Sequence, residues 1–434
     1  MLIEFTVKNF RSIKEEQTFS LVQGKGKELV GSNVFTPETP DGVKPLSFGL
    51  LKSAVIYGPN ASGKSNFLKA MEWMQDYILL SSDNEPNIEF APFLFDPETP
   101  TEPSFFEVIF LLDGIRYQYG FEATEQQVTG EWLFSFPQGR SLRWFEREFD
   151  ADSGNEVYRF GGGLSGQKHI WQGATRSKAL FLSTAVQLNS TGLKPIFDWF
   201  KFTLRYASLD ANYMGYTFHE YQTDRKAKIL SFLQAADLPI DDLVFTEEEL
   251  DVQKLKRLSK GIAEQFEKEK TKSITKVEVQ HNFAVGGAVL LAVGEESDGT
   301  RKMLHFAGPV IDVLEKGYVL FVDELHSSLH PKLVRYLIDL FHSPKSNPNG
   351  AQLIFTSHEL SNLSSEVFRR DQVWFCEKNS DQATELFPLS DFRPRKDELI
   401  AKFYMNGRYG ALPYINEVMD LFPSDETTTK NEPS

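Results

Sequence analysis

The feature that most constrains this chain is the segment Gly58 to Ser65, which reads Gly-Pro-Asn-Ala-Ser-Gly-Lys-Ser and fits the pattern G-x-x-x-x-G-K-[ST]. The apolar run Leu50 to Tyr57 precedes it as a predicted strand, and residues with helical spacing of apolar side chains follow from Asn66 to Leu79. These flanks favour a phosphate loop over an ordinary glycine-rich turn. Backbone N–H groups at such a helix N-terminus bind phosphate, so the segment predicts nucleotide chemistry in an α/β fold.

Two side chains of this phosphate loop have separate expected roles. Lys64 is expected to neutralise the β- and γ-phosphates of the nucleotide, and the Ser65 hydroxyl is expected to ligate Mg²⁺. The chain has no Asn-Lys-x-Asp segment of the kind that selects guanine, so we expect ATP as the nucleotide.

Composition predicts a large soluble cytoplasmic protein. The 434 residues are 41% hydrophobic and can bury one large core or two modest ones. Because 61 acidic residues outnumber 46 basic ones, the net charge of −15 argues against a global basic coat for nucleic acid, although a local basic groove would not show in that sum. The single cysteine, Cys376, excludes an intrachain disulfide. We find no apolar run long enough to span a bilayer and no secretory leader.

The pattern of the chain predicts three folded parts and a tail. Residues 1–182 combine the phosphate loop with alternating stretches, such as Phe105 to Phe121, that predict antiparallel hairpins. Residues 183–283 are predicted to form a helical insertion lobe, including a charged helix from Glu247 to Lys270. Residues 284–422 return to the α/β pattern. The polar tail 423–434 is expected to be disordered.

A second apolar strand is predicted to end in two acidic residues. The run Gly317 to Val322 precedes Asp323 and Glu324, the pattern of a Walker B strand. In a parallel sheet this strand would bring both carboxylates to the edge that carries the phosphate loop. We expect Asp323 to hold Mg²⁺ and Glu324 to act as the general base that activates the attacking water.

Two further segments complete the motif order. The predicted strand Ala351 to Thr356 leads to His358; a lone histidine at a strand end is most often a surface or capping residue. Ser297 and Gly299 precede a predicted helix from Met303 to Leu314, where a hydroxyl and backbone N–H groups could donate to phosphate. The same residues at 297–300 would also be expected if Ser297 were an ordinary N-cap of the helix.

The order of phosphate loop, signature-like loop, Walker B strand and histidine resembles the ABC-type ATPases, in the branch of SMC, RecF and OLD proteins. The similarity is closest to RloA- and AbiL-type ATPases of abortive-infection loci, and it rests on Gly58 to Ser65, Asp323 to Pro331 and Tyr404 to Pro413. It implies an ABC-ATPase-like head with a mixed or parallel phosphate-loop sheet, an antiparallel β subdomain and a helical lobe.

The resemblance also implies roles for single residues. Those that would contact ATP besides Lys64 are Asn60, Gly63, Ser65, Arg11, Ser297, Gly299 and Gln187, although a structural role explains Gln187 equally well. Ser65 and Asp323 would hold Mg²⁺, and Glu324 and His358 would be catalytic. The signature loop of one subunit would close over ATP held by the other, so a homodimer or higher oligomer is implied.

The sequence is consistent with two functions. The first is the ATPase sensor or scaffold of an antiphage system that controls a separately encoded nuclease or toxin, since the short stretch after His358 leaves no room for a second catalytic domain. The second is a RecF- or SMC-like DNA-repair ATPase that clamps DNA. The negative charge and the lack of a long coiled-coil pattern favour the first.

Overall fold

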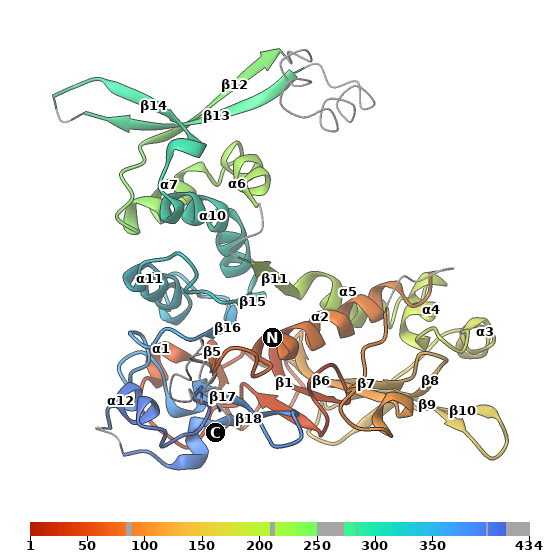
Figure 1. Ribbon diagram of the computed structural model, residues 1–434. Coiled ribbons are helices and arrows are strands. Elements are labelled where there is room, and N and C mark those ends of the chain that lie inside the picture. The colour runs from red at the N-terminus through yellow and green to blue at the C-terminus, as the bar shows by residue number, and fades with distance from the viewer. Residues whose placement is uncertain (84–88, 209–212, 250–272, 284, 396–397, 414–434) are drawn as a thin grey trace, which may run out of the picture.

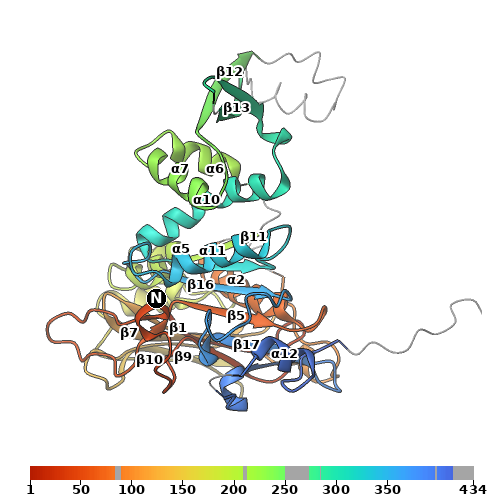
Figure 2. The ribbon, with the colours of Figure 1, turned by 90° about the vertical axis from the view of Figure 1, so that its left-hand side faces the viewer.

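The computed structural model describes residues 1–83, 89–208, 213–249, 273–283, 285–395 and 398–413. The described chain has an elongated lower body and an arm that rises from one end of it, so that the molecule is L-shaped (Figure 1). A view from the side shows the same arm standing above the body (Figure 2).

The outer layer of the body is a seven-stranded antiparallel sheet in the order β10-β9-β8-β7-β6-β1-β2. Its strands are β1 Leu2–Lys8, β2 Gln17–Ser20, β6 Ser104–Leu112, β7 Ile115–Ala123, β8 Val128–Ser135, β9 Leu142–Asp150 and β10 Asn155–Phe160. Burial alternates along β6, because one face packs on the core and the other meets water. The predicted antiparallel hairpins are confirmed.

The second sheet has six strands in the order β11-β15-β16-β5-β17-β18, and all neighbours except β17 and β18 are parallel. The bounds are β5 Ser53–Tyr57, β11 Leu204–Ser208, β15 Val319–Asp323, β16 Gln352–Ser357, β17 Val373–Lys378 and β18 Thr384–Pro388. Every residue of β5 and β16 is buried, since helices or sheet cover both faces. A two-stranded pair, β3 Val34–Phe35 and β4 Leu50–Leu51, lies beside it.

Alternate residues of the parallel sheet enter two different cores. Ala54 and Ile56 of β5 join a core shared with the antiparallel sheet and α2, whereas Val55 and Tyr57 face a second core with α10 and α11. Helix α2 therefore lies between the two sheets, beside α5 (Figure 1). The helices are α1 Val30–Asn33, α2 Lys64–Leu80, α3 Lys168–Ala174, α4 Phe181–Gln187, α5 Lys194–Thr203, α6 Met214–Tyr221, α7 Lys226–Ala235, α10 Asp298–Lys316, α11 Pro331–His342 and α12 Ile400–Met405.

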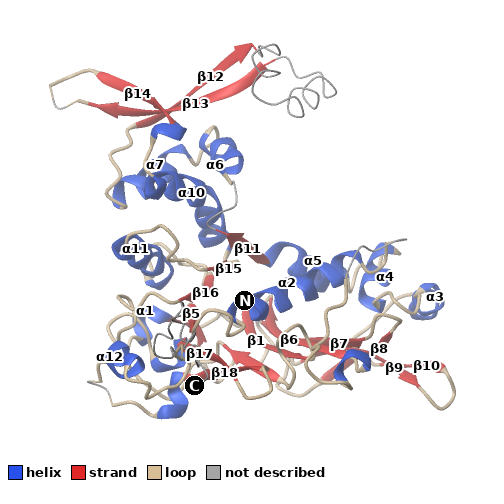
Figure 3. Cartoon of the chain, viewed as in Figure 1, coloured by secondary structure: helices blue, strands red, loops and turns tan. Residues whose placement is uncertain are grey.

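The arm consists of α6, α7, α10 and a three-stranded antiparallel sheet. The strands are β12 Asp242–Glu249, β13 Ser273–Asn282 and β14 Ala288–Ala292. Figure 3 shows these strands in red at the end of the arm, beyond the blue helices. Within the described residues, no helix combines the length and apolar character needed to cross a membrane.

The predicted helical lobe at 183–283 differs from the structure in two ways. Residues 204–208 form β11 of the parallel sheet, where Tyr206 stacks on Phe321 with ring centroids 4.9 Å apart. Residues 247–249 belong to β12, paired with β13, and not to the predicted charged helix. Strand pairing in three dimensions outweighs the helical spacing of a short charged segment. The rest of that predicted helix, residues 250–270, and the tail 423–434 lie outside the described residues.

A buried ion pair ties the antiparallel sheet to the helical layer. Glu131 of β8 accepts hydrogen bonds from the backbone N–H groups of Phe181 and Leu182, at 2.6 and 3.0 Å, and so caps the N-terminus of α4. Arg147 lies 3.7 Å from the same carboxylate, and both side chains are almost fully buried. The pair fixes where α4 meets the sheet.

Replacement of Glu131 by alanine is expected to lower the free energy of unfolding by about 3–5 kcal/mol, because Arg147 and two N–H groups lose a buried partner. The matched control is Glu148→Ala on the adjacent strand, whose pair with Arg159 is exposed and should contribute less than about 1 kcal/mol. Urea denaturation of both variants measures the difference. Equal losses would contradict the assignment.

Candidate nucleotide-binding and hydrolysis site

A hollow of about 400 Å³ opens at the carboxyl edge of the parallel sheet. It is lined by Asn60, Ala61, Ser62, Gly63, Lys64, Ser65, Asn66, Glu324 and Lys378. Strands β5 and β15 run in the same direction with β16 between them, so the residues that follow each strand meet at one edge. The structure therefore brings Glu324 to the phosphate loop, although 258 residues lie between it and Ser65 in the sequence.

The phosphate loop is held in shape by the C-terminal strand β18. Gly63 has a φ of 111°, and a Cβ at this position would lie 2.0 Å from the Thr384 hydroxyl oxygen. That hydroxyl donates to the Ser62 carbonyl at 2.9 Å. Glycine is required at position 63 because both the backbone conformation and the close approach exclude a side chain.

Lys64 is buried at the base of the hollow. Its ammonium group donates to the carbonyl oxygens of Gly58 and Pro59 at 2.8 and 2.9 Å, within the same loop. Burial lowers the pKa of Lys64, and the charges of Asp323 and Glu324 act in the opposite direction. The loop carbonyls thus hold the Lys64 ammonium at a position where it could bind a phosphate group.

Thr356 of β16 holds the two acidic residues that follow β15. Its hydroxyl donates to the Asp323 carboxylate at 2.5 Å and accepts from the Glu324 backbone N–H at 2.8 Å. Glu324 has a φ of 52°, a conformation that costs a residue with a side chain on the order of 1 kcal/mol. Ser327 donates to the Glu324 carboxylate at 3.3 Å. The strained backbone is held by these contacts, which fixes the direction of the exposed carboxylate.

The oxygen donors of Ser65 and Asp323 suit Mg²⁺, which prefers carboxylate, hydroxyl, phosphate and water oxygens. No group of three or more His, Cys, Asp or Glu side chains that could hold a metal is found in the described ranges. A cation held by few protein ligands fits Mg²⁺, because it usually binds together with substrate phosphates and keeps several waters.

His358 pairs with a second histidine at the same sheet edge. Its Nε2 lies 2.9 Å from Nε2 of His326, and the Ser357 hydroxyl lies 3.3 Å from Nδ1 of His326. Burial lowers the pKa of His326, and the neighbouring His358 lowers it further. At this distance one ring nitrogen must donate a hydrogen bond and the other must accept it.

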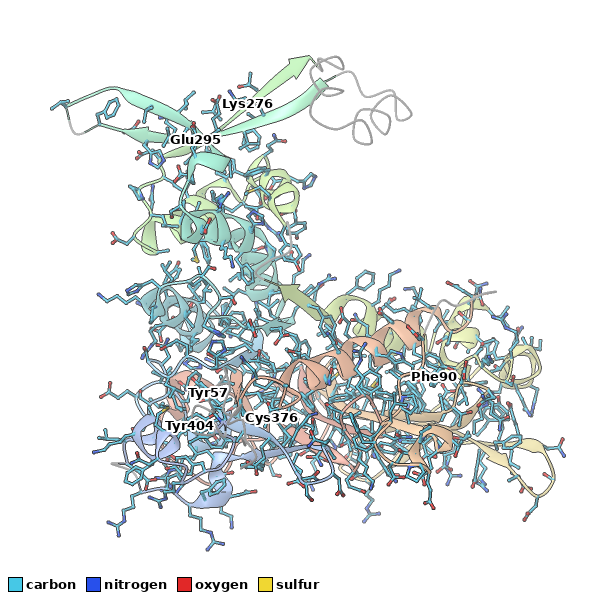
Figure 4. All side chains as sticks on the ribbon, in the orientation of Figure 1. Tyr57, Phe90, Lys276, Glu295, Cys376 and Tyr404 are labelled. Atoms are coloured by element: carbon cyan, nitrogen blue, oxygen red, sulfur yellow. The ribbon has the colours of Figure 1, made fainter. Side chains whose placement is uncertain are left out.

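The predicted signature loop lies outside the hollow of its own chain. Ser297 caps α10 by accepting from Thr300 N–H at 3.1 Å, as the alternative interpretation predicts, and Lys302 donates to the Ser327 carbonyl at 3.1 Å. Figure 4 shows Glu295, two residues before Ser297, at the base of the end sheet of the arm. Cys376, whose thiol donates to the Ser62 carbonyl at 3.4 Å, lies in the lower body.

A histidine of the arm contacts the predicted signature loop. His281 of β13 binds the Glu296 carboxylate through Nε2 at 2.7 Å and the Pro239 carbonyl through Nδ1 at 2.6 Å. Burial acts to lower the pKa of His281, but the hydrogen bond and charge of Glu296 outweigh it and raise the pKa. The position of the end sheet and the start of α10 are therefore coupled.

Two predicted contacts lie away from the hollow. Arg11 is exposed in the turn after β1, where its side chain covers Phe10 and its charge acts on Glu72 of α2. Gln187 ends α4, which binds the last turn of α2 through Ser183. Because α2 has 17 residues and is roughly 25 Å long, helix α4 lies at the end of α2 opposite to the phosphate loop (Figure 1).

Sequence reasoning missed three residues that shape the site: Thr356, Lys378 and Thr384. Thr356 ends an apolar run and directly precedes Ser357 and His358, so its position in the sequence could have indicated that it lies at the site. Lys378 and Thr384 lie on the last two strands of the sheet and belong to no motif. Their contact with the phosphate loop depends on strand order, which local sequence does not encode.

Comparison with solved structures finds distant similarities. The SMC head domain from Thermotoga maritima has 12% identity and a TM-score of 0.41, with 89% of this chain and 98% of that chain covered. An SMC head bound to the C-terminal winged-helix domain of ScpA has 10% identity and a TM-score of 0.39, with coverage of 89% and 97%. CbiO1 of Clostridium perfringens, part of the ABC transporter complex cbiONQ, has 10% identity and a TM-score of 0.30, with coverage of 93% and 96%. Among curated proteins, none matches this chain.

One protein family matches most of the chain. Residues 53–364 fit the sequence profile described as "AAA domain, putative AbiEii toxin, Type IV TA system". The matched range contains the phosphate loop, the acidic pair after β15 and His358, which are the groups that the fold gathers at one sheet edge. The chain therefore belongs to this AAA-domain ATPase family.

Proposed function

We propose that this protein hydrolyses ATP as a homodimer or higher oligomer and serves as the sensor or scaffold subunit of a bacterial antiphage system. One observation carries the enzymatic part of the proposal: Lys64 and Glu324 line the same hollow. A cation for the phosphates and a carboxylate for the attacking water are the two groups that ATP hydrolysis needs on opposite sides of the γ-phosphate.

The residues in and beside the hollow divide this chemistry among them. The N–H groups of the phosphate loop and the Lys64 ammonium bind the β- and γ-phosphates. Ser65 and Asp323 would hold Mg²⁺, which when bound neutralises phosphate charge. Glu324 accepts a proton from the attacking water, and Thr356 and Ser327 keep its carboxylate in position. His358, whose Nε2 lies 2.9 Å from that of His326, donates a hydrogen bond to the γ-phosphate.

Gly299 supports a site completed by a second subunit. A Cβ at this position would have its nearest neighbours at 4.0 Å, so nothing in the same subunit requires glycine. Glycine near the start of a helix costs up to about 1 kcal/mol relative to alanine. The missing side chain is accounted for if the first turn of α10, with Ser297, approaches ATP bound by the partner subunit.

The antiphage role is supported by the family to which the chain belongs, whose description names an AbiEii toxin and a type IV toxin–antitoxin system. In this proposal, ATP binding closes the dimer and hydrolysis opens it, and the state of the dimer controls a separately encoded nuclease or toxin. The net charge of −15 suits a protein partner better than a nucleic-acid one.

Lys64→Ala is expected to weaken ATP binding at least tenfold, because the buried ammonium that neutralises the phosphates is lost. Lys69→Ala, an exposed lysine of the same helix, is the matched control and should bind ATP as the natural protein does. Isothermal titration calorimetry measures both. Equal affinity of the two variants would refute the phosphate-loop assignment.

Glu324→Gln should retain ATP binding but slow hydrolysis by roughly 10²-fold or more, because the amide cannot accept the proton of the attacking water. With ATP the variant should accumulate as a closed dimer, which light scattering detects. Glu366→Gln, an exposed glutamate outside the hollow, provides the control for both measurements. A Glu324→Gln variant that stays monomeric with ATP would contradict the dimeric site.

Ser297→Arg should leave ATP affinity within about twofold, since the phosphate loop is untouched, and should abolish turnover through a clash at the partner's γ-phosphate. Mixing it with Lys64→Ala subunits should restore part of the hydrolysis, because one composite site then has an intact phosphate loop and an intact signature. Phosphate release measures turnover, and native mass spectrometry verifies subunit exchange. Full activity of Ser297→Arg alone would restrict Ser297 to its helix cap.

The antiphage role is tested by purifying the tagged chain together with the products of its neighbouring genes. A second polypeptide in a fixed ratio, whose nuclease or toxic activity changes with ATP, supports the proposal. Salt-dependent binding of duplex DNA without a second polypeptide would instead favour the DNA-clamp function.

A further inference from the structure

Two consecutive residues, Leu94 and Phe95, have large apolar side chains that are exposed. Leu94 is 72% and Phe95 is 69% exposed, whereas the preceding Phe93 is fully buried. The exposed Phe95 ring offers a flat apolar face that a bound ligand could cover.

The segment that carries Phe95 is held firmly. The Phe93 backbone N–H donates to the Asn9 side-chain oxygen at 3.0 Å, and the Thr99 hydroxyl donates to the Phe93 carbonyl at 2.7 Å. Asp96 forms an ion pair with Lys14 at 2.8 Å. Because these contacts lie on both sides of Phe95, the backbone that carries the exposed ring is already ordered before a ligand arrives, which lowers the entropic cost of binding.

Phe95 lies next to a residue that lines the hollow. The Lys378 ammonium is 5.8 Å from the centroid of the Phe95 ring, and Lys378 also lines the hollow with the phosphate loop and Glu324. One lysine therefore connects the phosphate-binding groups to the exposed ring. The N–H groups and Lys64 of the loop recognise only phosphates, so the base of a nucleotide needs another partner, and a flat aromatic ring beside a cation suits it.

We propose that Phe95 is the platform on which the purine ring of ATP stacks, with Lys378 between the base and the phosphates. The inference rests on the proposed function and deepens it by assigning the base-binding side of the site. Stacking covers the exposed ring, and the cation next to it stabilises both the aromatic ring and the phosphate charge.

The test compares ATP with inorganic tripolyphosphate, which has the phosphates but no base. Phe95→Ala should weaken ATP binding about tenfold or more and leave tripolyphosphate binding unchanged in calorimetric titrations. Phe202→Ala, which removes a partly exposed phenylalanine of α5, is the matched control and should bind both ligands normally. Phe95→Trp should keep ATP affinity and add an ATP-dependent fluorescence change to that of the natural protein.

Failure of this inference can be told apart from failure of the proposed function. If the natural protein binds neither ATP nor tripolyphosphate, the proposed function fails. If it binds both and Phe95→Ala keeps normal ATP affinity, only the stacking proposal is overturned. Equal weakening of both ligands in Phe95→Ala also overturns it, because the change would then act through the shape of the phosphate site.

Discussion

The parallel pairing of β5, β16 and β15 is the constraint on which the site depends. Three strands that run in the same direction deliver the phosphate loop, Thr356 and the acidic pair to one edge of the sheet. The hydroxyl of Thr356 then binds both Asp323 and the backbone of Glu324, so the middle strand sets the geometry of its neighbour's acids. Without this pairing the motifs would be separate turns with no common ligand.

The phosphate loop is also supported by the two ends of the chain. Thr384 of β18 bonds to the Ser62 carbonyl at 2.9 Å and to the Ser12 hydroxyl at 2.8 Å, and Ser12 accepts from Asn66 of α2 at 2.8 Å. Segments more than 300 residues apart in sequence thus share one buried polar network. Such a network resists distortion when phosphate charge enters the hollow, because its groups are already oriented.

Polar contacts connect the predicted signature loop to the end sheet of the arm and the first turn of α10 to the segment after β15. His281 joins β13 to Glu296, and Lys302 joins the first turn of α10 to Ser327, which also contacts Glu324. A displacement of the end sheet would therefore reach the acidic pair through only a few polar contacts.

The sequence by itself determined the strand, loop and helix around residues 58–65, the strand that ends in Asp323, and the antiparallel hairpin of β6 and β7, because each depends on local spacing of glycine and apolar residues. It did not determine that residues 204–208 add a strand to the parallel sheet or that residues 247–249 continue a strand, since pairing partners distant in sequence decide both. For Gln187 it left a nucleotide contact and a structural role open, and helix packing puts α4 at the end of α2 away from the phosphate loop. Only the tertiary structure brought Lys378 and Thr384 to the phosphate loop, and Phe95 beside Lys378, because strand order and loop packing are properties of the whole fold.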